Sequence, residues 1–296
     1  MTMPSGAPSE NLSEQLTQAA RYIAGRQCQD GGFCVYRNAY LEEPNLSDTW
    51  LALAGLRLLG VDIPRPNEVG IWLDGFNVAL LHHSALHDWA FSKQLLDATW
   101  APDTQVCQRI AALTLIPPKQ KNASLSSLKG LLNVARLKAE FASVEGATEV
   151  VTWLQGLRHH GYGSKPNLQE TALALELLAM LGAPDETDQT RVFVDALQSP
   201  YLGFNNTLDS RCCRLDILLA GLQCCARLGL SVKYGEVIAA IVFAAQRGDG
   251  AFADAPGSLA TLESHYNALV LINMLMPLHP AAAQLSSQNM PGMHRP

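Results

Sequence analysis

Two histidines one helical turn apart are the first residues in this sequence that could do chemistry. His83 and His87 stand at positions i and i+4 of a stretch that reads as a helix, so both rings would share one face and could bind a metal ion. The sequence has no HExxH pattern, and a pair of this kind more often forms a solvated rim. The solvated rim is the favoured interpretation, and a metal pair is the alternative.

Other patterns exclude several classes of protein. The sequence has no Gly-Lys-Ser/Thr phosphate loop, no Gly-x-Ser-x-Gly elbow and no Cys-x-x-Cys pair. A net charge of −6 without a basic cluster disfavours binding to nucleic acid. No apolar run approaches the ~20 residues of a transmembrane helix, and the first nine residues do not resemble a signal peptide. Seven cysteines without a disulfide framework fit a reducing compartment, so we expect a cytoplasmic protein.

A repeated unit of turn and helix must position any active side chains. The stretch Gln29-Asp30-Gly31-Gly32-Phe33 has the composition of a turn, and residues 48–60 read as a helix buried on nearly all sides. Similar turns that join glycine to an aromatic residue recur at 161–163, 203–204 and 249–252, and the remaining units fit turns near 75 and 118. The turns are spaced by about 43 residues, which is typical of a solenoid or a closed ring.

Six turns, each between two helical patterns, predict an all-α protein of twelve helices in one domain. The expected outer helices span residues 12–23, 67–73, 105–115, 148–157, 190–198 and 234–246. The expected inner helices span residues 46–59, 78–96, 124–141, 168–181, 209–228 and 262–276. The domain is predicted to cover residues 10–280, with a disordered tail at 1–9 and a flexible tail at 281–296.

The first unit resembles a known family. Its Asp-Gly-Gly-Phe turn, followed by a buried helix that starts Thr49-Trp50-Leu51-Ala52-Leu53, is similar to the prenyltransferase and squalene-oxidase repeat of protein prenyltransferase β subunits and terpene cyclases. The resemblance implies an α/α toroid, in which about six inner helices form a barrel, six outer helices surround it and the turns gather at one end. In that family the barrel binds isoprenoid chains against aromatic walls.

Aromatic residues on the expected inner helices are therefore candidates for binding a prenyl chain. They are Trp50, Trp89, Phe91, Phe141 and Tyr266, and each could equally pack between the two rings. The resemblance also implies that basic residues before the fifth inner helix hold a diphosphate, with Mg²⁺ as its companion ion. Arg211 and Arg214 have that place, and a guanidinium fork suits phosphate oxygens.

Protein prenyltransferases hold a zinc ion with an Asp-x-Cys pair and a histidine at the heads of the last two inner helices. The matched positions here carry Cys212, Arg214 and Glu263, so the triad is not reproduced. Ligands of the right type lie close by, and Asp209, Cys212 and His265 are the candidate zinc set, with Asp209 and His265 as candidate catalytic residues. The alternative is that Cys212 and Cys213 are ordinary buried cysteines.

Three further residues complete the candidate site. Class II cyclases carry an Asp-x-Asp-Asp acid, and its best match is Asn45-Leu46-Ser47-Asp48, which retains Asp48 but has Ser47 in the central position. Asp48 is a candidate catalytic residue that could bond a polar substrate group. His160 in the fourth turn, which also contains Arg158, His159 and Lys165, and Glu170 at the head of the fourth inner helix are candidates for substrate binding.

The resemblance implies a prenyltransferase-like enzyme that binds a prenyl diphosphate in a central apolar space and transfers the prenyl group. Two alternatives remain open. The first is a cyclase-type enzyme that acts on an isoprenoid without the Asp-x-Asp-Asp acid. The second is a non-catalytic toroid that binds an isoprenoid lipid or a protein partner, because a fold by itself does not determine an activity.

Overall fold

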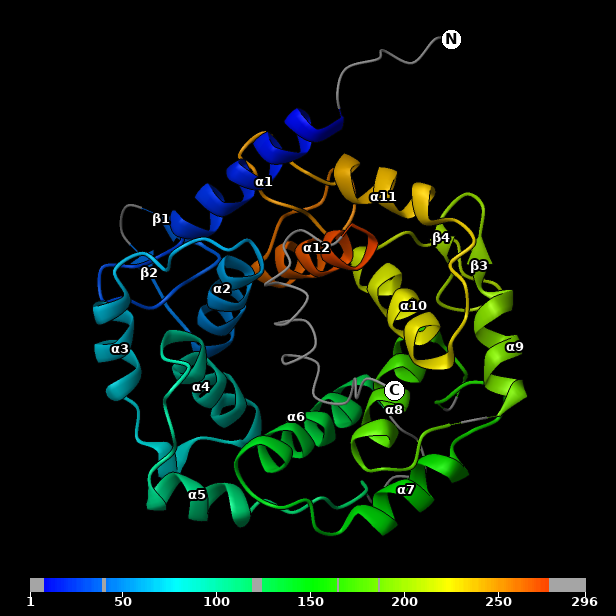
Figure 1. The fold of residues 1–296 in the computed structure, drawn as a ribbon, viewed down its shortest axis with the longest axis horizontal. Coiled ribbons are helices and arrows are strands. Elements are labelled where there is room, and N and C mark those ends of the chain that lie inside the picture. Colours follow the sequence, from blue (N-terminus) through cyan, green and yellow to red (C-terminus); the bar gives the residue numbers. More distant parts are fainter. Residues whose placement is uncertain (1–7, 39–40, 119–123, 164, 186, 277–296) are drawn as a thin grey trace.

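The computed structural model describes residues 8–38, 41–118, 124–163, 165–185 and 187–276. Along this part of the chain, helices of an outer and an inner ring alternate (Figure 1). The outer helices are α1 (Pro8–Ala24), α3 (Pro66–Asp74), α5 (Thr104–Ala111), α7 (Ala147–Gly156), α9 (Asp188–Ala196) and α11 (Gly235–Ala244). The inner helices are α2 (Leu46–Leu58), α4 (His83–Leu96), α6 (Leu125–Phe141), α8 (Leu168–Met180), α10 (Leu215–Leu228) and α12 (Leu262–Leu275).

The inner ring is closed. Each inner helix packs against the one before it and the one after it, and the last, α12, packs against the first, α2 (Figure 1). Each outer helix packs on the inner helix of its own unit, as α1 does on α2 and α11 on α12. The predicted α/α toroid is therefore confirmed, and the chain forms a closed ring rather than an open solenoid.

Five of the six inner helices begin at a residue whose side chain caps the first turn, whereas α10 begins at Arg214 without such a bond. In the first, fourth and sixth units the side chains of Asn45, Asn167 and Thr261 accept a hydrogen bond from a backbone N–H three residues later. Such caps satisfy donors that the first helical turn leaves unpaired. Because the helices that follow are buried on both the inner and the outer side, their apolar residues are spread around the circumference, as predicted for residues 48–60.

The turns of the first and sixth units share one hydrogen-bond pattern. The side-chain amides of Gln27 and Gln246 donate to the carbonyls of Gly31 and Gly250, at 3.1 and 3.3 Å. The carboxylates of Asp30 and Asp249 each accept a backbone N–H two residues later, at 3.2 Å. Gly31 and Gly250 have φ of 107° and 88°, which favours glycine.

Each of these turns docks on the outer helix of the following unit. A Cβ atom on Gly31 would collide with the backbone of Glu68 in α3, and one on Gly250 would collide with the backbone of Gln18 in α1. The amide of Gln246 also donates to the carbonyl of Gln15, at 2.9 Å. The turn of the last unit thus seals the outer ring against the first helix of the chain.

Within the described residues, two short antiparallel strand pairs lie in the loops. They are β1 (Arg37–Asn38) with β2 (Leu41–Glu42), and β3 (Gln198–Ser199) with β4 (Gly203–Phe204). In the described part of the chain, no helix is long and apolar enough to cross a bilayer.

Several predicted helix boundaries were wrong. The fifth inner helix begins at Leu215 rather than 209, because the N–H of Leu215 donates to the carbonyl of Asp254 and the residues before it form a loop. The second begins at His83 rather than 78, because Asn77 caps a separate short 3₁₀ turn, Val78–Leu80. Helix α1 begins at Pro8, inside the tail predicted for residues 1–9. Residues 1–7 and the tail predicted for 281–296 lie outside the described residues.

Candidate functional site

Linked aromatic rings extend over four neighbouring inner helices. Tyr266 of α12 and Trp50 of α2 have ring centroids 5.5 Å apart, and Trp50 lies 5.4 Å from His87 of α4. The series continues from His87 to Phe91 at 4.6 Å and from Phe91 to Phe141 of α6 at 5.6 Å. We call these five residues the aromatic arc. Contacts at such distances orient the rings and give a rigid apolar wall.

Charged side chains connect three neighbouring inner helices. The carboxylate of Glu176 in α8 pairs with Arg136 of α6 at 2.5 Å and with Arg227 of α10 at 3.3 Å. We call these three residues the ionic arc. Burial acts to raise the pKa of Glu176, but the two guanidinium groups outweigh it and hold that pKa below its usual range. Glu176 is therefore an ionised carboxylate although only 4% of its side chain is exposed.

The two arcs together span the six inner helices and meet on α6, which carries both Phe141 and Arg136. Burial raises the pKa of Tyr266, and the charges of Arg136 and Glu176 act on the same phenol. Helix α12 packs between α10 and α2, whereas Arg136 lies on α6, on the opposite side of the ring (Figure 1). Burial lowers the pKa of His87, and Arg136 also acts on this ring. Arg136 thus acts electrostatically on residues of α4 and α12 as well as on its ion-pair partner in α8.

Trp89 does not belong to the aromatic arc. Its indole N–H donates to the carbonyl of Leu73 in the outer helix α3, at 2.9 Å, and its ring meets that of Trp100 at 5.6 Å. The side chain is buried between the two rings. The prediction that Trp89 lines the barrel is therefore wrong, because an inner helix presents one face to the outer ring, and Trp89 lies on that face.

His265 is also directed toward the outer ring. Its Nδ1 accepts a hydrogen bond of 3.1 Å from the N–H of Phe252, and its ring stacks on Tyr22 of α1 at 5.1 Å. Burial lowers the pKa of His265 to about 3, so the ring is neutral. A neutral imidazole that accepts at Nδ1 carries its proton on Nε2, which leaves no free lone pair for a metal.

The predicted zinc set is not assembled. Asp209 and Cys212 are exposed in the loop before α10, whereas His265 is 1% exposed between the rings. Among the described residues, no group of three or more His, Cys, Asp or Glu side chains is placed to hold a metal ion. The alternative prediction, that Cys212 and Cys213 are ordinary buried cysteines, is wrong for Cys212, which is exposed, whereas Cys213 is half-buried.

His83 and His87 form neither a solvated rim nor a shared metal-binding face. His87 is 3% exposed, and its Nδ1 lies 2.9 Å from the carboxylate of Asp88. His83 is half-buried, and its Nε2 lies against Gly130 of α6. His87 is therefore a buried member of the aromatic arc and not part of a solvated rim.

The two arginines predicted to hold a diphosphate have different surroundings. The guanidinium of Arg214 bonds both oxygens of Asp216, at 3.1 and 2.7 Å, and pairs with Asp254 at 2.8 Å. Arg211 is exposed, and it donates to the carbonyl of Ser210 at 3.2 Å. Two carboxylates thus occupy the fork of Arg214, whereas that of Arg211 is open to solvent.

The remaining predicted residues lie at the turn end. Asp48 braces the first turn, since its carboxylate accepts from the N–H of Val35 at 3.0 Å and from the amide of Asn45 at 2.8 Å. Burial raises the pKa of Asp48, and it also raises the pKa of Glu170. Glu170 stands over the backbone of Gly163. His160 is exposed three residues before Gly163.

The basic residues of the fourth turn do not converge on one point. Arg158 pairs with Asp185 at 3.3 Å, and Asp185 also accepts from the hydroxyl of Tyr162 at 2.8 Å. The side chains of His159, His160 and Lys165 are exposed. Arg158 is therefore a structural residue of the turn.

The ionic arc was not found from the sequence, although a signal was present. Glu176 interrupts the apolar run Ala172–Met180, and Arg136 and Arg227 lie within helices that are otherwise largely apolar. A charge within a helix that must be buried on both sides needs a partner of opposite charge. Three such residues on adjacent inner helices would have predicted the arc.

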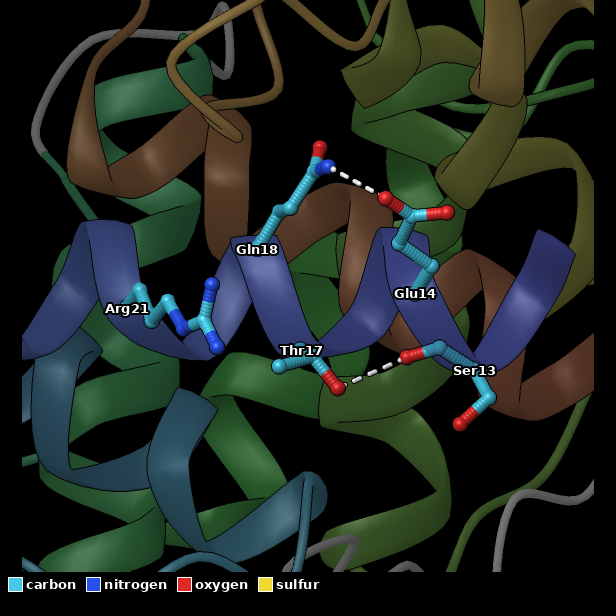
Figure 2. A pocket seen from close by; sticks show the side chains of 5 residues that line it. All are labelled: Ser13, Glu14, Thr17, Gln18 and Arg21. Atoms are coloured by element: carbon cyan, nitrogen blue, oxygen red, sulfur yellow. Dashed lines mark hydrogen bonds between the residues drawn. The ribbon is translucent and has the colours of Figure 1, made fainter. Parts of the chain in front are cut away.

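Among the described residues, two hollows lie against α1, outside the inner ring. Figure 2 shows one of about 390 Å³ on the polar face of α1, lined by Ser13, Glu14, Thr17, Gln18 and Arg21. Thr17 donates to the carbonyl of Ser13, and Gln18 to the carboxylate of Glu14, so these side chains bond within their own helix. The other, about 680 Å³, is a mostly apolar groove between α1 and the residues Leu59, Val61 and Met276. Neither contains an arrangement of catalytic groups.

Comparison with known families agrees with this architecture. The family described as the prenyltransferase alpha-alpha toroid domain matches residues 7–99 and 123–293, which include all six inner helices. No curated protein matches the chain by sequence. Because the match covers well over half of the chain and the helices close into the ring that it describes, the chain belongs to the prenyltransferase α/α toroid family.

Proposed function

We propose that this toroid is a prenyltransferase-like protein that binds a prenyl diphosphate inside its inner ring and transfers the prenyl group to an acceptor. The observation that carries the proposal is the aromatic arc, in which Trp50 contacts both Tyr266 and His87 on the neighbouring helices. An isoprenoid chain on such a wall gains about 25 cal/mol for each Å² of apolar surface removed from water. Ring faces also attract the positive charge that develops when the prenyl carbon leaves its diphosphate.

The diphosphate would lie at the turn end in this proposal. Arg211 would bind it there with its exposed guanidinium, and Arg214 would have to exchange one of its two carboxylates for a phosphate oxygen. Mg²⁺ would accompany the diphosphate, since one guanidinium does not neutralise its charge. Zinc has no part in the proposal, because Asp209, Cys212 and His265 do not fit such an ion.

Native mass spectrometry and calorimetry with farnesyl and geranylgeranyl diphosphate, with and without Mg²⁺, test the proposal. Trp50→Ala should weaken binding by about tenfold or more, because a central aromatic contact is worth about 2 kcal/mol. Trp89→Phe is the matched control, since Trp89 lies between the rings and its removal should change stability but not affinity. Equal affinity of Trp50→Ala and the wild type would contradict the proposal.

A second candidate is a toroid that binds its ligand or a protein partner without catalysis. The separation of His265 from Asp209 and Cys212 and the occupied fork of Arg214 favour it. Release of diphosphate in the presence of thiol and other nucleophilic acceptors separates the two. Stoichiometric binding of the prenyl diphosphate with no diphosphate released would support the non-catalytic function.

A further inference from the structure

We propose that Cys28 and Cys34 are an oxidisable pair, which a small disulfide such as oxidised glutathione converts to a disulfide bond across the first turn. The two Sγ atoms are 3.1 Å apart, and the thiol of Cys28 donates to the sulfur of Cys34. A disulfide bond is about 2.05 Å long, so a shift of about 1 Å joins the sulfurs. The proposal goes beyond the proposed function and does not depend on it.

The backbone of the turn directs both thiols to one side. Gln27 and Phe33 are antiparallel partners, and the backbone N–H groups of the two cysteines donate across the turn, at 2.8 and 3.2 Å. Each cysteine follows one member of this pair, so the alternation of side chains along a strand places both thiols on the same face. The sulfurs can therefore join while the backbone hydrogen bonds of the turn remain.

Neighbouring parts of the chain hold the two cysteines in place. The guanidinium of Arg65 donates to the carbonyl of Cys28 at 2.7 Å. The N–H of Val35, the residue after Cys34, donates to the carboxylate of Asp48 in α2 at 3.0 Å. Both ends of the turn are thus anchored, and the folded chain keeps the sulfurs together instead of leaving their meeting to chance.

The surroundings of the pair suit a disulfide better than a metal ion. Two thiolates that share a tetrahedral zinc ion lie about 3.8 Å apart, which is farther than the sulfurs here. Among the described residues no third ligand completes a metal-binding group with them. The thiol of Cys34 donates to the carbonyl of Tyr36 at 3.3 Å, a weak bond that a disulfide gives up at little cost.

Another buried pair of cysteines provides a comparison inside the same chain. Cys224 and Cys225 are adjacent in α10 and both buried. Successive side chains of a helix point about 100° apart, so these two thiols diverge. Oxidation should therefore join Cys28 to Cys34 and leave Cys224 and Cys225 as thiols.

The reaction is a thiol–disulfide exchange in two steps. One cysteine loses its proton to solvent, and its sulfur attacks oxidised glutathione, which breaks the S–S bond and releases one glutathione thiolate. The other cysteine then loses its proton and attacks the mixed disulfide, which forms the bond between Cys28 and Cys34 and releases the second thiolate. Two electrons pass from the cysteines to glutathione, whose thiolates take up the two protons. Burial raises the pKa of Cys28 to about 12, so exchange on the folded protein is slow at neutral pH.

The test measures how far folding favours the bond. The full-length protein, starting once reduced and once oxidised, is refolded from urea in buffers of graded reduced and oxidised glutathione, and parallel samples stay in urea. Free thiols are then trapped with iodoacetamide. Trypsin releases both cysteines in one peptide, residues 27–37, which is two hydrogen atoms lighter when the disulfide is present. A bond that stabilises the fold is itself stabilised by folding, so its equilibrium constant should be about tenfold or more larger in the folded chain.

Variants separate this pair from the other cysteines. The oxidised wild type should melt about 5 °C above the reduced wild type. Cys34→Ser keeps a hydroxyl that can donate to Tyr36, and its melting temperature should not respond to oxidised glutathione. Cys107→Ser is the matched control, since the half-buried thiol of Cys107 donates to the carbonyl of Pro102 and should not affect the bond. The peptide measurement uses the wild type alone, so it stands even where a variant fails to fold.

The outcomes are distinct. A lighter peptide 27–37 that forms at lower oxidant in the folded chain than in urea, and that reduction reverses, supports the proposal. Equal equilibrium constants in the folded and unfolded chains overturn it. Glutathione retained on Cys28 or Cys34 in place of the bond between them overturns it too. None of these results bears on isoprenoid binding.

Discussion

The Nδ1 atom of His265 accepts the backbone N–H of Phe252 at 3.1 Å, and this bond has counterparts in two other units of the ring. In the first unit the hydroxyl of Thr49 accepts a hydrogen bond from the backbone N–H of Phe33, and in the fourth the hydroxyl of Thr171 accepts one from the N–H of Tyr162, both at 3.0 Å. Each acceptor stands four residues after the N-cap of its inner helix. The imidazole of His265 therefore holds the sixth turn to its helix, a task that threonine performs elsewhere.

The shared position predicts the effect of substituting His265. His265→Ala should lower the free energy of unfolding by about 2–4 kcal/mol, because it leaves the amide of Phe252 unpaired and opens a cavity beside Tyr22. His265→Thr should recover about 1 kcal/mol or more of that loss, since a hydroxyl at this position accepts the same bond. Urea denaturation measures both, and a threonine variant no more stable than the alanine variant would be inconsistent with a shared role.

The burial of His265 makes stability depend on pH. Its pKa is about 3 in the folded protein and about 6.5 when unfolded, so the unfolded chain binds the proton more tightly. The stability that the neutral ring contributes is complete above pH 6.5 and is lost as the pH falls toward 3. The loss in the free energy of unfolding is about 2 kcal/mol at pH 5. Unfolding free energies between pH 7 and 4 measure it. His265→Thr should show a shallower decline over this range, and an identical slope would refute the assignment.

Two glycines with similar φ test the seal between the last turn and α1. Gly250 has φ of 88° and Gly257 has φ of 81°, so alanine is strained at both. Only at position 250 would the added Cβ collide with the backbone of Gln18, whereas nothing lies within 4 Å of it at 257. Gly257→Ala should cost about 1 kcal/mol and Gly250→Ala about 3 kcal/mol or more. Thermal unfolding of the pair checks the difference, and similar melting temperatures would exclude a tight seal.

The cysteines should react with alkylating reagents in two classes. Cys212 is exposed and should be labelled first. Cys28 and Cys225 are buried, and burial raises their pKa to about 12 and about 11, so they should be labelled only after unfolding. Peptide mass spectrometry after a timed pulse of iodoacetamide measures the order. Labelling of Cys28 as fast as that of Cys212 would mean that the first turn opens readily.

The ring could be predicted from the sequence because its units repeat. The Asp-Gly turn at Gly31 recurs at Gly250 with the same hydrogen bonds, and the buried helices that follow differ from ordinary amphipathic ones. Boundaries were missed where a local contact overrides the helical pattern, as at Leu215, whose N–H bonds to Asp254 instead of extending the helix toward 209.

The candidate site was harder to predict, because periodicity does not tell which side of an inner helix a residue occupies. Trp50 and Trp89 both lie on inner helices, yet Trp50 contacts Tyr266 in the aromatic arc and Trp89 bonds Leu73 of the outer ring. His265 and Tyr266 are adjacent in sequence and face opposite sides. Both faces of these helices are apolar, so only the packed structure separates the wall of the ring from its core.

The bond between Gln246 and Gln15 joins residues that are 231 positions apart. During synthesis, α1 leaves the ribosome long before the turn that covers it, so its contact with the sixth unit waits until nearly the whole domain has been made. Contacts between such distant segments form slowly, since the entropy of closing the intervening chain must be overcome first. The nascent chain therefore passes through a period as an open arc, with the apolar side of α2 that later meets α12 exposed to other proteins.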